Sequence, residues 1–273
     1  MDKVVSYEQI QDFVTQIRSL KRGFVTNFFW NERKHPYWLA VGSMFYDIEN
    51  ESIVMMHKDN DFSNIFYIST SLEEAAKHIC GLKYENDEVL DLVIKDDDKK
   101  QLVPFVNTGF IEYRHLLRMS HVGSFDIASW CPEGVVSAHK GDIPSLMKTL
   151  SMGFDPLAEQ LPSEEELSDS IERGEVLLIK DGEAICGFIM FEIIGKTWHL
   201  RYWYTSSDYR NRGIGANLLK AALITGKDTK RQILWVMSLN DNAIKRYEHY
   251  GFKKELLNDY IMIKRNKYER ENY

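Results

Sequence analysis

The second half of the chain alternates short apolar runs with helical patterns. Two apolar runs, at 174–180 and 183–194, flank the turn signal Asp181-Gly182, and this arrangement predicts a β-hairpin. The capping-box spacing of Ser163 and Glu166 predicts a helix that ends at Gly174. The remaining predicted elements are a strand at 197–205, a helix at 215–224, a strand at 232–237, a helix at 242–250 and a strand at 259–263. This order predicts an α/β (α+β) fold with a mixed central sheet flanked by helices.

The first half contains a fainter copy of the same pattern. When Gly109-Phe110 is placed on Gly251-Phe252, other apolar positions of the two halves also coincide. The matching segments are 92–94 with 234–236, Leu102 with Ile244, 111–119 with the last strand, and 65–80 with the strand and helix at 197–224. A fixed shift of this kind predicts two tandem lobes with one topology.

A stretch rich in glycine and proline separates the two halves. Residues 120–134 (SHVGSFDIASWCPEG) show no periodicity, but they include Phe125 and Trp130, which favours a packed connector over a flexible linker. We therefore expect a first lobe at 1–121, a connector at 122–133 and a second lobe at 134–273.

The composition limits the class of protein. Lys and Arg number 34 against 41 Asp and Glu, and the resulting net charge of -7 argues against a general binder of nucleic acid or of anionic membranes. The chain lacks both a long apolar segment and the charged-then-apolar start of a secretory signal. Cys80, Cys131 and Cys186 are too scattered for a disulfide framework or a thiolate metal site. We expect a cytoplasmic protein that needs no metal.

The clearest chemical signal is a glycine loop between the aromatic strand and the apolar helix that follows it. Gly213 and Gly215 allow backbone N–H groups to approach a ligand, and a helix start favours an anion such as a phosphate. Arg210 and Arg212 add charge-assisted contacts. Leu218 stands where the dinucleotide-binding fingerprint has its third glycine, and the Gly-Lys-Ser/Thr ending of a phosphate loop is absent from the sequence. Both of those nucleotide-binding interpretations are therefore disfavoured.

Two motifs follow one another at a characteristic spacing in the second half. Arg210, Gly213 and Gly215 match the pattern Arg/Gln-x-x-Gly-x-Gly/Ala. The pattern Asn-x-x-Ala…Tyr-x-x-x-Gly-Phe is matched by Asn240, Ala243, Tyr247, Gly251 and Phe252. With these motifs, residues 200–252 resemble the core of the GCN5-related N-acetyltransferase (GNAT) family, and the first half resembles a degenerate GNAT-like lobe.

The resemblance implies the transfer of an acyl group from acetyl-CoA, by direct attack, to the primary amine of a small molecule. It implies that the glycine loop holds the pyrophosphate and that the strand before it pairs with the pantetheine arm. The implied cofactor-binding residues are Trp203, Tyr204, Thr205, Arg210, Asn211, Arg212, Gly213, Ile214, Gly215, Ala216, Asn240 and Ala243. Tyr247 is the implied proton donor to the departing thiolate, and a phenol suits this role because it is protonated at neutral pH.

The base that takes a proton from the attacking amine is left open. Many relatives carry a Glu on the strand before the loop, where this chain has Arg201. His199 and Glu192 are the remaining candidates. We expect that His199 and Arg201 do not both face the cleft; an Arg201 that faces it would bind a carboxylate or phosphate of the acceptor.

The first lobe departs from the family pattern. Phe105 stands in place of Tyr247, Asp98 stands in place of Asn240, and the link at 69–71 has neither glycine nor arginine. We expect this lobe to lack a cofactor site and to shape the acceptor pocket or the interface between the lobes. The aromatic residues considered for such a surface are Phe28, Phe29, Trp30, Tyr37 and Trp38, and burial in the core is the simpler interpretation for most of them.

Two other functions are compatible with paired lobes. The CoA-type loop disfavours an aminoacyl or peptidyl transferase, and Tyr247 disfavours a non-catalytic acyl-CoA sensor. The expected partner is a small-molecule amine acceptor, without nucleic acid or membrane, and the expected state is a monomer or homodimer.

Overall fold

The computed structural model describes residues 1–59 and 61–266, which fold into two units. Unit 1 consists of Met1–Leu116 together with residues 256–266, and unit 2 consists of Leu117–Glu255. The chain passes from one unit to the other within strand β7 (Ile111–Val122) and again within strand β13 (Lys253–Lys264), so the units divide at points other than the connector expected at 122–133. Among the described residues, no helix has the length and apolar character needed to cross a membrane.

Unit 1 is a mixed sheet with helices on both faces. Its strands follow the order β1-β3-β4-β5-β6-β13, and β2 also pairs with β5. The elements are β1 (Asp2–Lys3), α1 (Tyr7–Ser19), β2 (Val25–Thr26), α2 (His35–Ala40), β3 (Met44–Glu49), β4 (Ser52–Lys58), β5 (Phe62–Ser69), α3 (Leu72–Gly81), β6 (Asp87–Lys95), the 3₁₀-helix η1 (Lys99–Leu102) and α4 (Val103–Val106).

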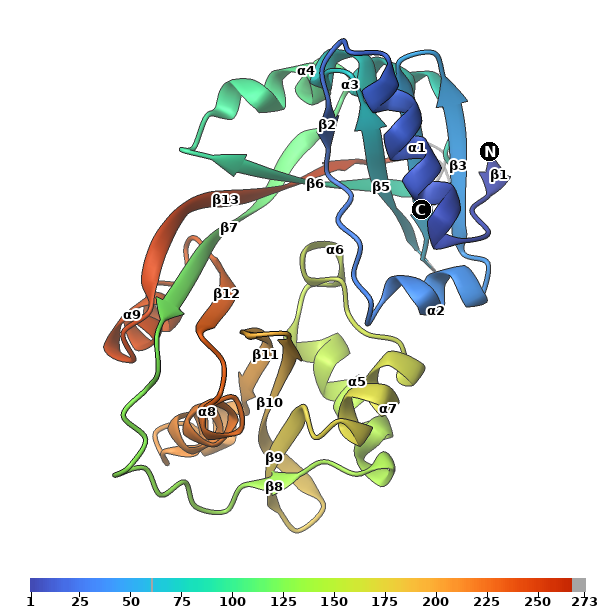
Figure 1. Cartoon of the computed structure of the whole chain (residues 1–273). Coiled ribbons are helices and arrows are strands. Elements are labelled where there is room, and N and C mark those ends of the chain that lie inside the picture. The colour runs from blue at the N-terminus through green and yellow to red at the C-terminus, as the bar shows by residue number, and fades with distance from the viewer. Residues whose placement is uncertain (60, 267–273) are drawn as a thin grey trace. The chain divides into compact units, whose positions relative to one another are not determined.

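Two apolar cores lie on the two faces of this sheet. Ile53 and Phe66 pack with α1 and α2, whereas Val54 and Tyr67 pack with α3 and α4. Figure 1 shows α1 and α3 on opposite sides of β5. Because β4 and β5 are buried on both faces, they occur in the sequence as continuous apolar runs.

The last strand of the chain completes unit 1. Residues 257–264 of β13 pair antiparallel with 88–95 of β6, and Tyr260 and Met262 are fully buried in the core that faces α3. The sequence places this strand in the second lobe by chain order alone, since its apolar alternation does not identify the sheet that it joins.

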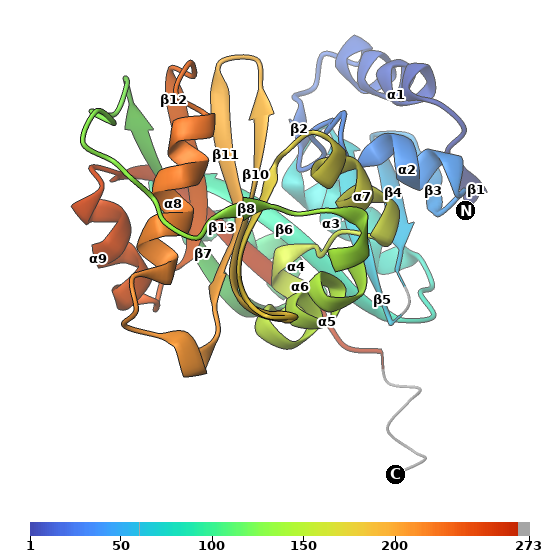
Figure 2. The same ribbon diagram turned by 90° about the horizontal axis from the view of Figure 1, so that it is seen from below.

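Unit 2 has the same layered construction. Its strands follow the order β12-β11-β10-β9-β8. The elements are β8 (Val136–Ser137), the 3₁₀-helix η2 (Lys140–Asp142), α5 (Ile143–Gly153), α6 (Pro156–Glu159), α7 (Glu164–Glu172), β9 (Val176–Asp181), β10 (Ala184–Ile194), β11 (Thr197–Thr205), the 3₁₀-helix η3 (Ser207–Tyr209), α8 (Ile214–Thr225), β12 (Arg231–Met237) and α9 (Asp241–His249). Helix α8 covers one face of β10 and β11, and α5 and α7 cover the other (Figure 2). Ile244 and Tyr247 of α9 join the core on the α8 side.

The predicted elements of unit 2 are present with small shifts at their ends. The capping box is confirmed, since Ser163 Oγ accepts from Glu166 N at 3.2 Å and Glu166 Oε2 accepts from Ser163 N at 2.7 Å. The hairpin is also confirmed, but its turn is Gly182-Glu183, one residue later than predicted, because Asp181 pairs with Ala184.

The tandem repeat is confirmed by its local geometry. Strands β5 and β6 run parallel around α3, as β11 and β12 do around α8. Phe110 N donates to Phe105 O at 3.2 Å, and Phe252 N donates in the same way to Tyr247 O at 3.0 Å. The glycine before each of these phenylalanines has a positive φ, 98° at Gly109 and 86° at Gly251. The same turn therefore ends the last helix of both repeats.

Candidate active site

The parallel strands β11 and β12 separate halfway along their length. Their register runs from Thr197 and Arg231 to Leu200 and Leu234, but β11 continues to Thr205 and β12 continues to Met237. The other edge of β11 stays paired with β10 as far as Thr205. An opening between two diverging strands exposes backbone groups that an extended, amide-bearing ligand can pair with.

The loop after β11 brings a helix start to this opening. Gly213 is the N-cap of α8 with φ 77°, and in the described structure no side chain caps the helix. The first hydrogen bond within this helix runs from Asn217 N to Gly213 O at 2.9 Å. The N–H groups of 214–216 therefore have no carbonyl acceptor within the helix. Arg210 and Arg212 are exposed in the same loop. Uncapped N–H groups, the helix dipole and two guanidinium groups form a suitable site for a pyrophosphate.

Two glycines hold the helix start close to the sheet. A Cβ at Gly215 would lie 3.2 Å from Thr205 Oγ1 and 3.3 Å from the Trp203 ring, whose Nε1 donates to Gly215 O at 3.2 Å. A Cβ at Gly187 of β10 would lie 2.8 Å from both Ile214 Cγ2 and Tyr204 O. Gly187 belongs to neither sequence motif, although a lone glycine inside a strand pattern is a signal of close backbone approach.

The second motif builds the helix that carries Tyr247. Asn240 is the N-cap of α9, and its Oδ1 accepts from Ala243 N at 3.2 Å. Tyr247 is buried on the following turn, with its ring centroid 5.5 Å from that of Trp203. Burial raises the pKa of Tyr247, so its hydroxyl stays protonated far above neutral pH.

A β-bulge brings three charged or titratable side chains together. Glu192 pairs with His199, and the register then shifts so that Leu200 and Tyr202 oppose successive residues of β10 and Arg201 is the extra residue. Arg201 Nε lies 3.6 Å from Glu192 Oε1. Residues two apart in a strand return to the same side, so the alternation of β11 does not separate His199 from Arg201, and Arg201 reaches Glu192, the partner of His199. Whether both residues face the cleft stays a prediction.

The backbone around Glu192 is held by the main-chain carbonyl and the side-chain carboxyl group of a second buried glutamate, Glu175. Glu175 O accepts from Phe191 N at 3.0 Å, and Glu175 Oε1 accepts from Ile193 N at 3.1 Å. These two bonds hold the residues on either side of Glu192 where the bulge disturbs the ladder. Glu192 is buried, and its Oε2 has no hydrogen-bond partner among the described residues.

Arg201 and His199 differ in charge at neutral pH. Burial, together with the positive charges of Arg201 and Arg118, lowers the pKa of His199 to about 3, so this imidazole is neutral at pH 7. Burial opposes the charge of Arg201, but Glu192 and Tyr202 hold its pKa above the ordinary value. The group therefore contains a charged Arg201, a neutral His199 and the carboxyl group of Glu192. In the described part of the chain, no group of three or more His, Cys, Asp or Glu is arranged to hold a metal ion.

Comparisons with known proteins agree with this geometry. Residues 144–252 match the acetyltransferase (GNAT) family. An acetyltransferase from the GNAT family of Colwellia psychrerythraea is 13% identical, with 97% of this chain and 99% of that chain covered at a TM-score of 0.56. A tandem GNAT protein from the clavulanic acid biosynthesis pathway is 9% identical, with 96% of each chain covered at a TM-score of 0.55.

A GCN5-related N-acetyltransferase from Sphaerobacter thermophilus is 14% identical, with 80% of this chain and 82% of that chain covered at a TM-score of 0.54. At these identities the likeness shows the fold, and no curated protein matches the chain. The matched segment contains both motifs, the opening between β11 and β12 and the uncapped start of α8. Residues 144–252 therefore match the acetyltransferase (GNAT) family, and the N-terminal half resembles a second, degenerate lobe of the same fold.

Proposed function

We propose that unit 2 transfers the acyl group of acetyl-CoA directly to a primary amine of a small molecule. The observation that carries this proposal is the opening between β11 and β12 beside the uncapped start of α8. One extended ligand with amides along its length and a pyrophosphate at its end would satisfy both features.

The fit to CoA is supported by the chain's own residues. The N–H groups of 214–216 and the side chains of Arg210 and Arg212 would hold the pyrophosphate, and the edge of 203–205 would pair with the pantetheine arm. Gly187 and Gly215 support this fit, since a Cβ at either position would displace the loop from the sheet. Acetyl-CoA supplies the reactive thioester, and the proposal requires no metal.

Tyr247 is proposed as the acid that protonates the thiolate leaving group. Its raised pKa keeps the proton on the phenol until a strong base forms next to it. Asn240 and Ala243 act indirectly, because they begin the helix that presents Tyr247.

Glu192 is proposed as the acceptor of the amine proton. Its buried Oε2, without a hydrogen-bond partner in the described part of the chain, supports this role. His199 remains the second candidate, although a pKa of about 3 makes it a weak base in the free protein. Arg201 directs Nε toward Glu192, and we propose that its Nη groups bind a carboxylate or phosphate on the acceptor. The acidic, cysteine-poor composition supports a cytoplasmic setting.

Calorimetry with acetyl-CoA, followed by thiol release with a panel of amines, tests the proposal. We expect binding by the full chain, weaker binding when Arg210 and Arg212 are both changed to Ala, and unchanged binding in the control Lys227→Ala, which removes an exposed cation just beyond the opposite end of α8. Binding without thiol release on any amine would instead favour an acyl-CoA sensor. If acetyl-CoA does not bind, the proposal is wrong.

A further inference from the structure

The parallel strands β5 and β6 of unit 1 separate as β11 and β12 do. Their register runs from Phe62 and Asp87 to Asn64 and Val89, after which β5 continues to Ser69 and β6 continues to Lys95. Unit 1 therefore has the same opening as the one that, under the proposed function, receives the pantetheine arm in unit 2.

A segment of the chain itself lies in this opening. Strand β2 pairs Val25 with Ser69 and Thr26 with Ile68. Strand β4 already pairs with residues 63–69 of β5 along the other edge, so β2 lies on the edge that faces β6. Thr26 Oγ1 adds a hydrogen bond to Tyr67 O at 2.7 Å.

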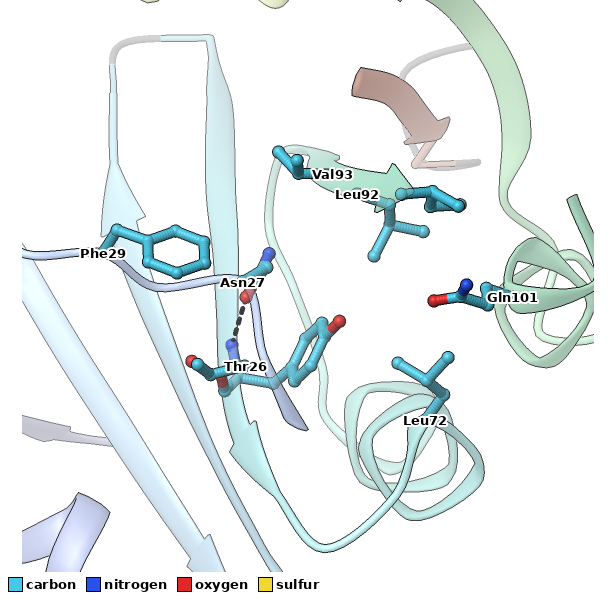
Figure 3. A pocket seen from close by; sticks show the side chains of 9 residues that line it. Thr26, Asn27, Phe29, Leu72, Leu92, Val93 and Gln101 are labelled. Carbon is cyan, nitrogen blue, oxygen red and sulfur yellow. Dashed lines mark hydrogen bonds between the residues drawn. The ribbon is translucent and has the colours of Figure 1, made fainter. Parts of the chain in front are cut away.

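The side-chain amide of Asn27 connects the two separated strands. Its Nδ2 donates to Ile65 O of β5 at 3.0 Å and to Asp91 O of β6 at 3.1 Å. Its Oδ1 accepts from Tyr67 N at 2.7 Å, the bond drawn as a dashed line in Figure 3. One side chain therefore satisfies three backbone groups that the divergence of the strands would leave without strand partners.

The end of the opening that corresponds to the pyrophosphate site is closed as well. A Cβ at Gly23, which has φ 116°, would lie 2.5 Å from Thr70 O. The backbone at Gly23 therefore packs directly against the backbone at Thr70, in the link between β5 and α3. Ser71 Oγ caps α3 by accepting from Glu74 N at 3.2 Å, and Glu73 and Glu74 add negative charge to the first turn. Helix α8 has neither a side-chain cap in the described structure nor an acidic residue in its first turn.

The space that remains is small. A cavity of about 30 Å³ lies between the segment and the strands, and Leu72 and Gln101 point into it from α3 and η1 (Figure 3). Such a volume holds about two water molecules and no acyl-pantetheine arm.

We propose that residues 23–29, which we call the strap, are the resident occupant of the ligand opening of unit 1. The backbone of β2 and the amide of Asn27 take the hydrogen bonds that an amide-bearing ligand would otherwise make with β5 and β6. Unit 1 consequently binds no CoA, and the chain takes one CoA through unit 2; this stoichiometry rests on the proposed function of unit 2.

Amide hydrogen exchange and calorimetry on the full chain test the strap. In Asn27→Ala, the amide of Tyr67 should exchange about tenfold faster or more, whereas Asn50→Ala, at an exposed turn of the same unit, should leave it unchanged. Asn27→Asp keeps the acceptor for Tyr67 N and loses both donors, so it should show a smaller increase and provides a milder variant where Asn27→Ala does not fold. Unchanged exchange at Tyr67 in both Asn27 variants would overturn the proposal.

Calorimetry should give one acetyl-CoA per wild-type chain. Two acetyl-CoA per chain would overturn the strap and leave the function of unit 2 intact. No binding would contradict the function of unit 2, and the exchange of Tyr67 would then decide on the strap by itself.

Discussion

Gly187→Ala should weaken acetyl-CoA binding although Gly187 lies on strand β10, outside the glycine loop. The added Cβ would lie 2.8 Å from Ile214 Cγ2, at the start of α8, and 2.8 Å from the backbone oxygen of Tyr204. Ordinary contacts between such atoms are about 3.5 Å, so the helix start or the end of β11 must move by roughly 0.7 Å. That movement changes the distance between the uncapped N–H groups of α8 and the edge of β11, the two features that one ligand must reach together.

Gly187→Ala should lower the stability of the fold as well as the affinity for acetyl-CoA, and the two effects are measured separately. Overpacking of this kind costs about 1–3 kcal/mol of the free energy of unfolding. We expect the Kd for acetyl-CoA to rise about tenfold as well, since charge-assisted hydrogen bonds to the pyrophosphate contribute about 1.5–3 kcal/mol each. Calorimetry measures the Kd, and thermal unfolding measures the stability.

Two other glycines provide a graded comparison. Gly215→Ala brings a Cβ to 3.2 Å from Thr205 Oγ1, a side-chain atom, so a smaller rise in Kd is expected. Gly81→Ala is the matched control, because a Cβ there meets nothing within 4 Å and it lies in unit 1. If Gly187→Ala binds acetyl-CoA as tightly as Gly81→Ala does, the reasoning about the helix start is refuted.

Three further predictions address the acid, the last strand and the response to pH. Tyr247→Phe should lower kcat about 10²-fold or more in steady-state assays, with little change in the Kd for acetyl-CoA. The control Tyr250→Phe should leave both constants unchanged. An unchanged kcat in Tyr247→Phe would show that Tyr247 is not the acid. Met262→Ala should lower the free energy of unfolding by about 2–5 kcal/mol, because this side chain of the last strand is fully buried in the core of unit 1. In hydrogen-exchange experiments the amides of unit 1 should exchange faster, and faster exchange confined to unit 2 would contradict the placement of Met262. Burial lowers the pKa of His35 to about 3 and of His57 to about 4, below the ordinary 6.5. The unfolded chain therefore binds more protons than the folded chain in this range, and each histidine should lower the free energy of unfolding by about 1.4 kcal/mol per pH unit as the pH falls from about 6 to 4. Thermal unfolding across this range, compared with His57→Gln, checks the effect, and an equal acid response in both proteins would exclude His57 as a source.

The loop and the helices of the site were predictable because local sequence determines them. Gly213, Gly215 and the apolar helix after them indicate an anion site through backbone geometry that only a few residues control. Asn240 is identified in the sequence through the second motif, and the structure adds that it caps α9. The order of strands and helices in unit 2 follows from hydrophobic periodicity in the same way.

The bulge at Arg201 and the strand exchange at β13 depend on pairing partners that periodicity does not identify. A bulge adds one residue to one strand, and the pairing register with β10, not the apolar pattern of β11, identifies Arg201 as that extra residue. Likewise, Tyr260 and Met262 suit either core by polarity. The strap was missed because β2 is only two residues long and Asn27 is a single polar side chain whose partners are separated from it by at least 38 positions.

The two openings show how one topology is completed in two different ways. Strands that diverge leave backbone donors and acceptors at their edges, and in a folded protein these groups require partners. In unit 1 the chain provides them through Asn27 and β2, and Ser71 caps the helix that follows. In unit 2 the corresponding helix starts at Gly213 without a side-chain cap in the described structure. An opening that is filled by the chain itself leaves few groups for a ligand, whereas an uncapped helix start beside an unpaired strand edge has the features of a binding site. The contrast between α3 and α8 therefore supports the ligand site proposed for unit 2, independently of the family motifs.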